Sequence, residues 1–340
     1  MLRWIPLLLV AAPGVAAAYP IPPQTLWALT TKADLVAVAE TKNVEVGDEH
    51  GFATLKILET WRGPRTKEVR VRYRAQVICP APPRFVPNEM VLVFLERDGD
   101  DFEVVGLSYG TLYPHFDELA AYEAAVRSVR DEASLVERRK WLVERAARRA
   151  TRWHGVYELT DHDRRRWYPP RRLAAQPSAV RRHVPAARAQ RGPQMGYHGA
   201  ERERIVLTDA DRQTLAHGLV REPSADDALF AALTLLDDFV DPRLDRVAVA
   251  ALDELAREPP PYDFAEYLEI VLKRLGHFVE LPAEEEREIE DPLLDAPDER
   301  QRWALAYWQK LRPTLDIDTA DVELDTRLPR VLGTGSDTPP

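Results

Sequence analysis

A run of five apolar-alternating segments between Ala33 and Leu112 constrains the fold more than any other feature of the sequence. The first segment, ADLVAVAETKNVEV, is rich in residues that favour strands. In the second, FATLKILETW, one register is apolar and the other is largely polar, before Gly63 and Pro64 end the segment. Both segments are therefore predicted to be strands.

The three later segments complete a predicted barrel. In KEVRVRYR, Val69, Val71 and Tyr73 share one face and three arginines share the other, which indicates a half-buried strand. MVLVFLE is more uniformly apolar, as expected for a strand covered on both faces. A turn from Asp98 to Asp101 joins it to FEVVGLSYGTLY as a hairpin. Five such strands predict an OB-like β-barrel.

The first residues have the pattern of a secretory signal peptide. A basic start at Arg3 precedes an apolar run from Trp4 to Val10, and small residues at 16–18 satisfy the rule for cleavage. The run is far shorter than the roughly 20 apolar residues of a spanning helix. We therefore expect cleavage after Ala18, no membrane span in the mature chain, and a secreted or periplasmic location.

Motifs in the barrel region resemble the netrin/TIMP-like OB domains of secreted bacterial proteins. They are a short helix-like TLWALTTKAD, then DLVAVAE, LKILETWRGP, a Cys-Pro pair at Cys79, and PNEMVLVFLE before a hairpin. The resemblance covers about residues 24–130. Metalloprotease inhibitors of that fold begin with a disulfide-bonded cysteine that chelates the catalytic zinc. Here the mature chain would begin at Tyr19 and Cys79 is its single cysteine, so that mechanism does not carry over.

After the barrel the sequence is helical, with clear start and stop signals. Helices are predicted after the capping residues Ser134, Thr208 and Ser224, and after Asp241 with proline at the first helical position. A further helix runs from about Phe264 to Leu275 and a last one, ERQRWALAYWQKL, is expected to bury Trp303, Ala306, Tyr307 and Leu311. Paired helices with short connections favour HEAT-like stacking or an irregular bundle.

The predicted fold class is thus β + α, an OB-like barrel followed by an all-α domain, and the length of 340 residues suits more than one domain. We divide the chain into a signal peptide (1–18), the barrel with flanking helices (19–131), a helical extension (132–163), a basic linker (164–204), an acidic α-helical domain (205–313) and a disordered tail (314–340).

The basic linker is the sharpest shift in composition. Between residues 164 and 200 the chain has nine arginines, five prolines and no acidic residue, although its net charge is −10. These arginines could contact an acidic partner or another anion, or they could be neutralised by the acidic helical domain. The candidate contacts are Arg164, Arg165, Arg166, Arg171 and Arg172. Nucleic acid is not expected, because no recognisable reader module accompanies the charge.

The search for catalytic and metal-binding motifs assigns no catalytic residue, cofactor or metal ligand. Gly106-Leu107-Ser108-Tyr109-Gly110 matches the G-x-S-x-G pattern, but no helix is expected to start at Ser108. His154 lies near His162, yet the spacing lacks an i, i+4 pair, and solvated loop positions are the preferred interpretation. The aspartates at 98, 100 and 101 are interpreted as a hairpin turn rather than a calcium loop.

We therefore expect a non-catalytic binding protein of the cell envelope or extracellular space, with another protein as its partner. Two alternatives are a protease inhibitor, acting through a barrel edge or the proline-rich loop Ile78–Val86, and a serine hydrolase using Ser108.

Overall fold

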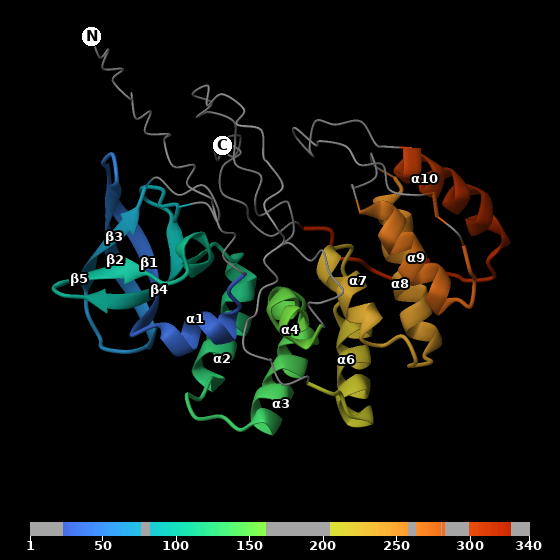
Figure 1. Ribbon diagram of the computed structural model, residues 1–340, viewed down its shortest axis with the longest axis horizontal. Coiled ribbons are helices and arrows are strands. Elements are labelled where there is room, and N and C mark those ends of the chain that lie inside the picture. The colour runs from blue at the N-terminus through green and yellow to red at the C-terminus, as the bar shows by residue number, and fades with distance from the viewer. Residues whose placement is uncertain are drawn as a thin grey trace, which may run out of the picture.

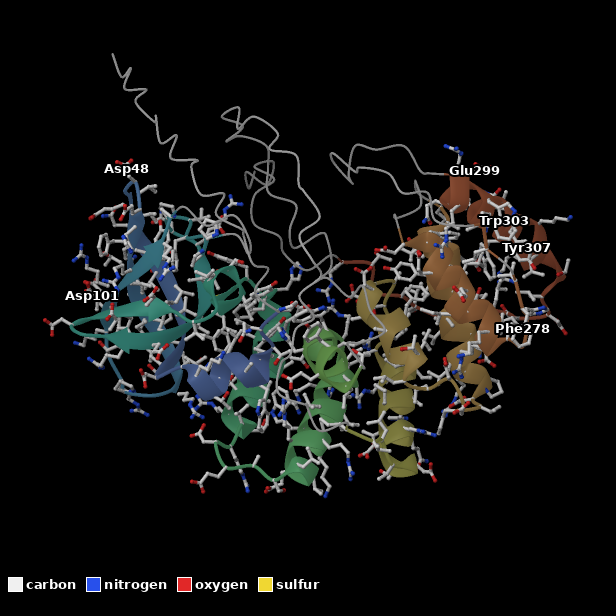
Figure 2. The ribbon with its side chains drawn as sticks, viewed as in Figure 1. Asp48, Asp101, Phe278, Glu299, Trp303 and Tyr307 are labelled. Atoms are coloured by element: carbon white, nitrogen blue, oxygen red, sulfur yellow. The ribbon has the colours of Figure 1, made fainter. Side chains whose placement is uncertain are left out.

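The computed structural model describes residues 23–75, 82–160, 205–257, 263–279, 281–282 and 299–327. A β-barrel lies at one end of the molecule and a succession of helices leads away from it (Figure 1). Figure 2 shows Asp48 and Asp101 at the barrel end, and Trp303 and Tyr307 on the last helix at the opposite end. The predicted class, a β-barrel followed by helices, is confirmed.

Five strands close the barrel. They are β1 (Leu35–Val46), β2 (His50–Arg62), β3 (Glu68–Arg74), β4 (Met90–Asp98) and β5 (Asp101–Val104). The order is β1-β2-β3-β5-β4, and pairing of β1 with β4 completes the circle. The β3–β5 pair is parallel and the other pairs are antiparallel. This closed, mixed barrel is compatible with an OB-like fold.

Both faces of β4 are buried, as its uniform apolar sequence predicts. Val91, Val93 and Leu95 fill the barrel interior, while Leu92 and Phe94 point outward into a second core formed with the helices. Strand β1 divides its residues between the same two cores. By contrast, the arginines that alternate along β3 lie outside the barrel, because their apolar neighbours fill its interior.

The fifth predicted strand is interrupted. Strand β5 ends at Val104, a 3₁₀ turn η1 covers Leu107–Gly110, and a short strand β6 (Thr111–Leu112) then pairs with β4. The break occurs where Gly106 and Leu107 adopt φ values of 69° and 57°. An extended chain cannot continue through two successive residues in this left-handed region.

Four helices lie nearest the barrel: α1 (Leu26–Lys32), α2 (Leu119–Ser128), α3 (Leu135–Ala146) and α4 (Arg152–Leu159). Ser134 begins α3 with the predicted cap, since its hydroxyl accepts a hydrogen bond from the N–H of Glu137. Trp27 of α1 meets Trp141 of α3 edge to face at 5.1 Å. Phe116 does not join this packing: it lies in the turn before α2 and is 84% exposed.

In the described ranges of the second half, the helices are α6 (Asp209–Arg221), α7 (Asp227–Thr234), α8 (Pro242–Leu255), α9 (Phe264–Arg274) and α10 (Glu299–Leu311). The predicted caps at Thr208 and Asp241 are confirmed. The cap predicted at Ser224 is wrong. Asp226 begins α7 by accepting the N–H of Leu229, and Ser224 is instead buried as a partner of Arg152.

The buried face of α10 differs from the prediction. Gln301, Ala304 and Trp308 are buried, whereas Ala306 is exposed and Trp303 is half-buried. Polar contacts explain this rotation. The Gln301 side chain accepts the backbone N–H of Ala265 at 2.8 Å, and the Trp308 indole donates to Asp253 at 3.0 Å. A prediction from periodicity assigns the buried face by hydrophobicity alone. It therefore misses hydrogen bonds, such as these two, that require Gln301 and Trp308 to face inward.

One continuous apolar core joins the outer wall of the barrel to helices α1 to α10 in the described ranges. The segment after α10 also connects the end of the described chain to the region next to the barrel. Asp325 forms an ion pair with Arg149 at 3.0 Å, and Arg327 pairs with Asp117 at 2.8 Å, just before α2. Residues 315–327 thus cross back to the barrel side, although a disordered tail was predicted from 314. In the part of the chain that the structure describes, no helix is long and apolar enough to cross a bilayer.

Candidate functional site

The residues that the sequence singled out as partner contacts lie outside the described ranges. This applies to Arg164, Arg165, Arg166, Arg171 and Arg172, and also to Cys79 and His162. The inhibitor loop is described only from residue 82 onward. There Phe85 is buried against Tyr73 with ring centroids 5.4 Å apart, so this part of the loop is anchored to the barrel.

Ser108 lies in the 3₁₀ turn η1 and not at the start of an α-helix. Its carbonyl accepts a hydrogen bond from the Thr111 hydroxyl at 3.2 Å. The next α-helix, α2, begins only at Leu119. The structural context that lets a G-x-S-x-G serine act as a nucleophile, a helix N-terminus directly after the residue, is therefore not found at this position.

The interpretation of His154 as a solvated loop residue is wrong. His154 lies in α4 and is 7% exposed, with Trp153 and Tyr122 edge-on to its ring at 5.0 and 6.1 Å. Its Nδ1 accepts the backbone N–H of Leu26 at 3.2 Å, at the start of α1. Burial lowers the pKa of His154 to about 3. The residue is a neutral structural acceptor that fastens α1 to α4.

We expect this histidine to make the protein sensitive to mild acid. The unfolded chain takes up a proton near pH 6.5 and the folded chain does so only near pH 3, so stability is lost as pH falls below 6.5. The loss between pH 8 and pH 5.5 should be about 1.4 kcal/mol for this one residue. Urea unfolding at both pH values measures it.

Two variants separate this contribution from other titrations. His154→Gln keeps an acceptor but cannot ionise, and should flatten the dependence between pH 5.5 and 8. His217→Gln, at an exposed position of α6, is the matched control for replacing a histidine by glutamine outside this contact. An undiminished slope in His154→Gln would assign the acid sensitivity to other groups.

The aspartates after β4 form a turn, as predicted. Asp98, the last residue of β4, pairs with Asp101, the first residue of β5. Gly99 lies between them and has a φ of 62°. Arg72 of β3 pairs with Asp98, and Arg70 lies 3.8 Å from Asp101. Within the described ranges, no group of three or more His, Cys, Asp or Glu side chains is placed to hold a metal ion.

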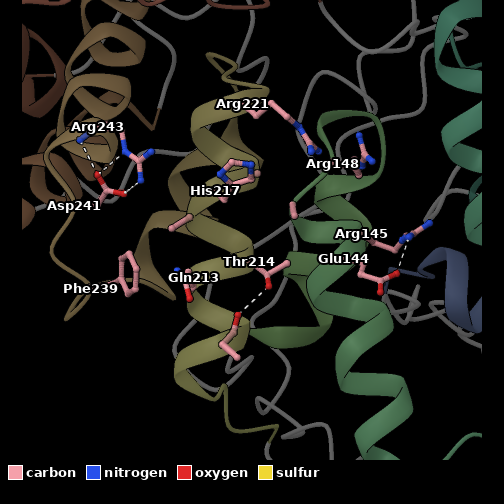
Figure 3. Close-up of a pocket in the computed structure, with 14 residues that line it drawn as sticks. Glu144, Arg145, Arg148, Gln213, Thr214, His217, Arg221, Phe239, Asp241 and Arg243 are labelled. Carbon is pink, nitrogen blue, oxygen red and sulfur yellow. Dashed lines mark hydrogen bonds and ion pairs between the residues drawn. The ribbon is translucent and has the colours of Figure 1, made fainter.

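A groove on the helical side is the main candidate for a functional surface (Figure 3). It has a volume of about 610 Å³ and runs from the end of α3 across α6 to the α7–α8 connection. Its lining combines four arginines with two carboxylates, three other polar side chains, one aromatic ring and small residues. The lining residues are Glu144, Arg145, Ala147, Arg148, Ala210, Gln213, Thr214, Ala216, His217, Gly218, Arg221, Phe239, Asp241 and Arg243.

Helical periodicity places one wall of the groove. In α6, Leu215 and Leu219 are fully buried, which leaves positions 213, 217 and 221 on the open side. These positions are four residues apart, so Gln213, His217 and Arg221 form one polar stripe along the helix.

Small residues form the floor of the groove, where α6 approaches the end of α3. A Cβ added at Gly218 would lie 2.4 Å from the carbonyl oxygen of Ala147 and 2.5 Å from its methyl group. Neither contact is compatible with the observed backbone. The absence of a side chain at Gly218 therefore allows α6 to approach the end of α3 this closely. The longer side chains on either side of this contact form the walls of the groove.

At one end of the groove, two arginines from different elements share one carboxylate. Arg148 follows α3 and Arg221 ends α6, and both side chains lie at this end of the groove (Figure 3). Their guanidinium groups converge on Glu222 Oε1 at 2.8 and 3.0 Å. Partial burial alone would raise the pKa of Glu222, but hydrogen bonds from the Arg149 N–H and from Arg148 lower it overall. Glu222 therefore stays ionised, and this end has two positive charges for one negative charge.

The other end of the groove is built on the α7–α8 connection. Arg243 donates Nε and a terminal nitrogen to Asp241 at 3.1 and 2.8 Å. The same Asp241 caps α8 by accepting the backbone N–H of Arg243 at 2.9 Å. Phe239 is half-buried beside this pair, and Val240 between them is 91% exposed.

No protein-family model and no curated protein matches this chain by sequence. The groove therefore has to be interpreted from its own residues. Sequence reasoning missed it, because its walls come from α3, α6 and the α7–α8 connection. The one available signal was the polar stripe at 213, 217 and 221.

Proposed function

We propose that this chain is a non-catalytic binding protein that acts outside the cytoplasm and holds an acidic protein partner. The observation that carries the proposal is the concave surface at α3, α6 and α8, where arginines outnumber carboxylates in a chain with a net charge of −10. The signal-peptide pattern at residues 1–18 supports the location.

The chemistry of the arginines supports an acidic partner. A guanidinium group presents five N–H donors in a planar fork that matches a carboxylate, and remains charged at every physiological pH. Hydrogen bonds between ionised partners are roughly twice as strong as neutral ones. Arg148 and Arg221 keep about half of their side-chain surface exposed, so a partner can reach both.

A capture experiment tests this function. The mature chain from Tyr19 onward, immobilised at low and at high salt, should retain a protein from an envelope extract. Arg148→Gln/Arg221→Gln should retain much less of it, because both cationic side chains at one end of the groove are lost. The matched control is Arg130→Gln/Arg257→Gln, which removes two exposed arginines elsewhere that also pair with a glutamate.

The outcomes separate clearly. Retention lost in the groove variant and kept in the control supports the proposal. Equal retention by both variants, with unchanged folding by circular dichroism, would reject the groove as the contact surface. Capture only at low salt that the groove variant does not reduce would assign the contact to nonspecific charge.

A further inference from the structure

We infer that the occupant of this groove is a short extended peptide segment with two carboxylates and an apolar side chain between them. The inference rests on the binding function proposed above and specifies the chemistry of its ligand. One carboxylate would bind at Arg148 and Arg221, the other at Arg243, and the apolar side chain would contact Phe239.

The first anchor is the pair of arginines at Glu222. Each guanidinium donates one terminal nitrogen to the same Glu222 oxygen. With five N–H donors on each group, both retain capacity for a second carboxylate. His217 lies beside Arg221 on the open side of α6 and can donate a hydrogen bond to the same ligand group (Figure 3).

The second anchor is Arg243. Its contacts to Asp241 use the edge of the guanidinium that contains Nε. The edge formed by the two terminal nitrogens still has N–H groups that Asp241 does not use, and it can bind a second carboxylate in bidentate fashion. The Arg243 side chain is 61% exposed, so a ligand can reach this edge.

The apolar contact lies next to the second anchor. Phe239 lines the groove and is only half-buried. Its ring gains by burial against a ligand, at roughly 25 cal/mol per Å² of apolar surface removed from water. A purely ionic ligand would leave this side chain in water.

The arrangement favours a peptide over a polyanion. Glu144, Glu222 and Asp241 stand among the arginines, and a ligand with a charge at every unit would meet all three at close range. A peptide with two separated carboxylates can contact the arginines and avoid these acidic groups. The mixed pattern is therefore suited to sparse negative charge with apolar residues between.

A ligand that reaches both anchors has to cross α6, because Arg148 and Arg243 lie on opposite sides of this helix (Figure 3). A helix with its side chains is about 10–12 Å across, and an extended chain advances roughly 3.3 Å per residue. Carboxylates about four positions apart are therefore the shortest spacing that a test peptide should have.

A peptide-binding measurement tests the inference. The probe is a fluorescein-labelled peptide with two glutamates four positions apart and leucines between, followed by anisotropy with the mature full chain. We expect Arg148→Gln/Arg221→Gln and Arg243→Gln each to weaken binding by about tenfold, and Phe239→Ala by a smaller factor. The exposed control Arg130→Gln/Arg257→Gln should bind like the wild type.

Two ligand controls make the outcome decisive. Replacing both glutamates of the peptide by glutamine should abolish binding, and equal binding by that peptide would overturn the inference. Inorganic polyphosphate that displaces the probe and binds more tightly would reassign the groove to polyanions. If no peptide binds but capture from the extract still depends on Arg148 and Arg221, the proposed function stands and this ligand chemistry falls.

Discussion

Replacing Arg152 with methionine is expected to lower the free energy of unfolding by about 3–5 kcal/mol, because three buried acceptors lose their donor at roughly 1–3 kcal/mol each. Arg152 in α4 is fully buried. It donates to the Ser224 hydroxyl and to the Glu222 carbonyl, both at 2.6 Å, and to the Ala146 carbonyl at 3.3 Å. Methionine fills much of the volume but leaves these three acceptors without their donor.

The effect should be read from urea unfolding followed by tryptophan fluorescence, with the m-value unchanged. Arg130→Met, at an exposed surface pair, should shift stability by less than about 0.5 kcal/mol. A double-mutant cycle with Ser224→Ala isolates the buried contact, because Ser224 loses its role once the guanidinium is absent. A loss below about 1 kcal/mol in Arg152→Met would show that water or other groups replace the donor.

Arg152 also connects stability to the candidate site. Its hydrogen bond to the Glu222 carbonyl fixes the backbone directly after α6. The Glu222 side chain in turn forms the ion pairs with Arg148 and Arg221. Arg152→Met should therefore weaken peptide binding even under conditions where the chain stays folded. Restoring stability by lowering the temperature should not restore that affinity, because the anchor would still lack its support.

Elements that are determined by residues close together in the sequence could be predicted from the sequence alone. Alternation in β3 and the uniform apolar run in β4 predicted which faces are buried. A strand with one covered face alternates apolar and polar residues, whereas a strand covered on both faces is apolar throughout. Thr208 and Asp241 could be recognised as caps because the hydrogen bonds they make are within three residues.

The remainder depended on contacts between distant segments. Ser224 has the sequence of a cap but is used by Arg152, seventy-two positions earlier, so Asp226 begins α7. His154 has the sequence of a polar position, yet its acceptor role requires the N-terminus of α1. The groove likewise needs α3 and α6 to meet at Gly218, which no local pattern reveals.

The close contact between α3 and α4 gives the second large effect: Gly155→Ala should destabilise the protein by about 2–3 kcal/mol. A Cβ at Gly155 would lie 2.3 Å from the backbone N of Ala146 and 2.4 Å from the carbonyl oxygen of Leu142. Both are backbone atoms of α3, so no side chain can rotate away. The helices must separate instead, which opens the core around Leu142 and Val156.

The close contact and helix propensity predict effects of opposite sign for Gly155→Ala. Alanine is about 1 kcal/mol better than glycine inside an ordinary helix, so a stabilising or neutral Gly155→Ala would contradict the close contact. Gly276→Ala is the control, because its φ is 74° and no atom lies within 4 Å of the added Cβ. It should cost only the roughly 1–2 kcal/mol of the left-handed backbone, with no effect on helix packing. Since α3 also forms one wall of the groove, Gly155→Ala should reduce peptide binding and Gly276→Ala should not.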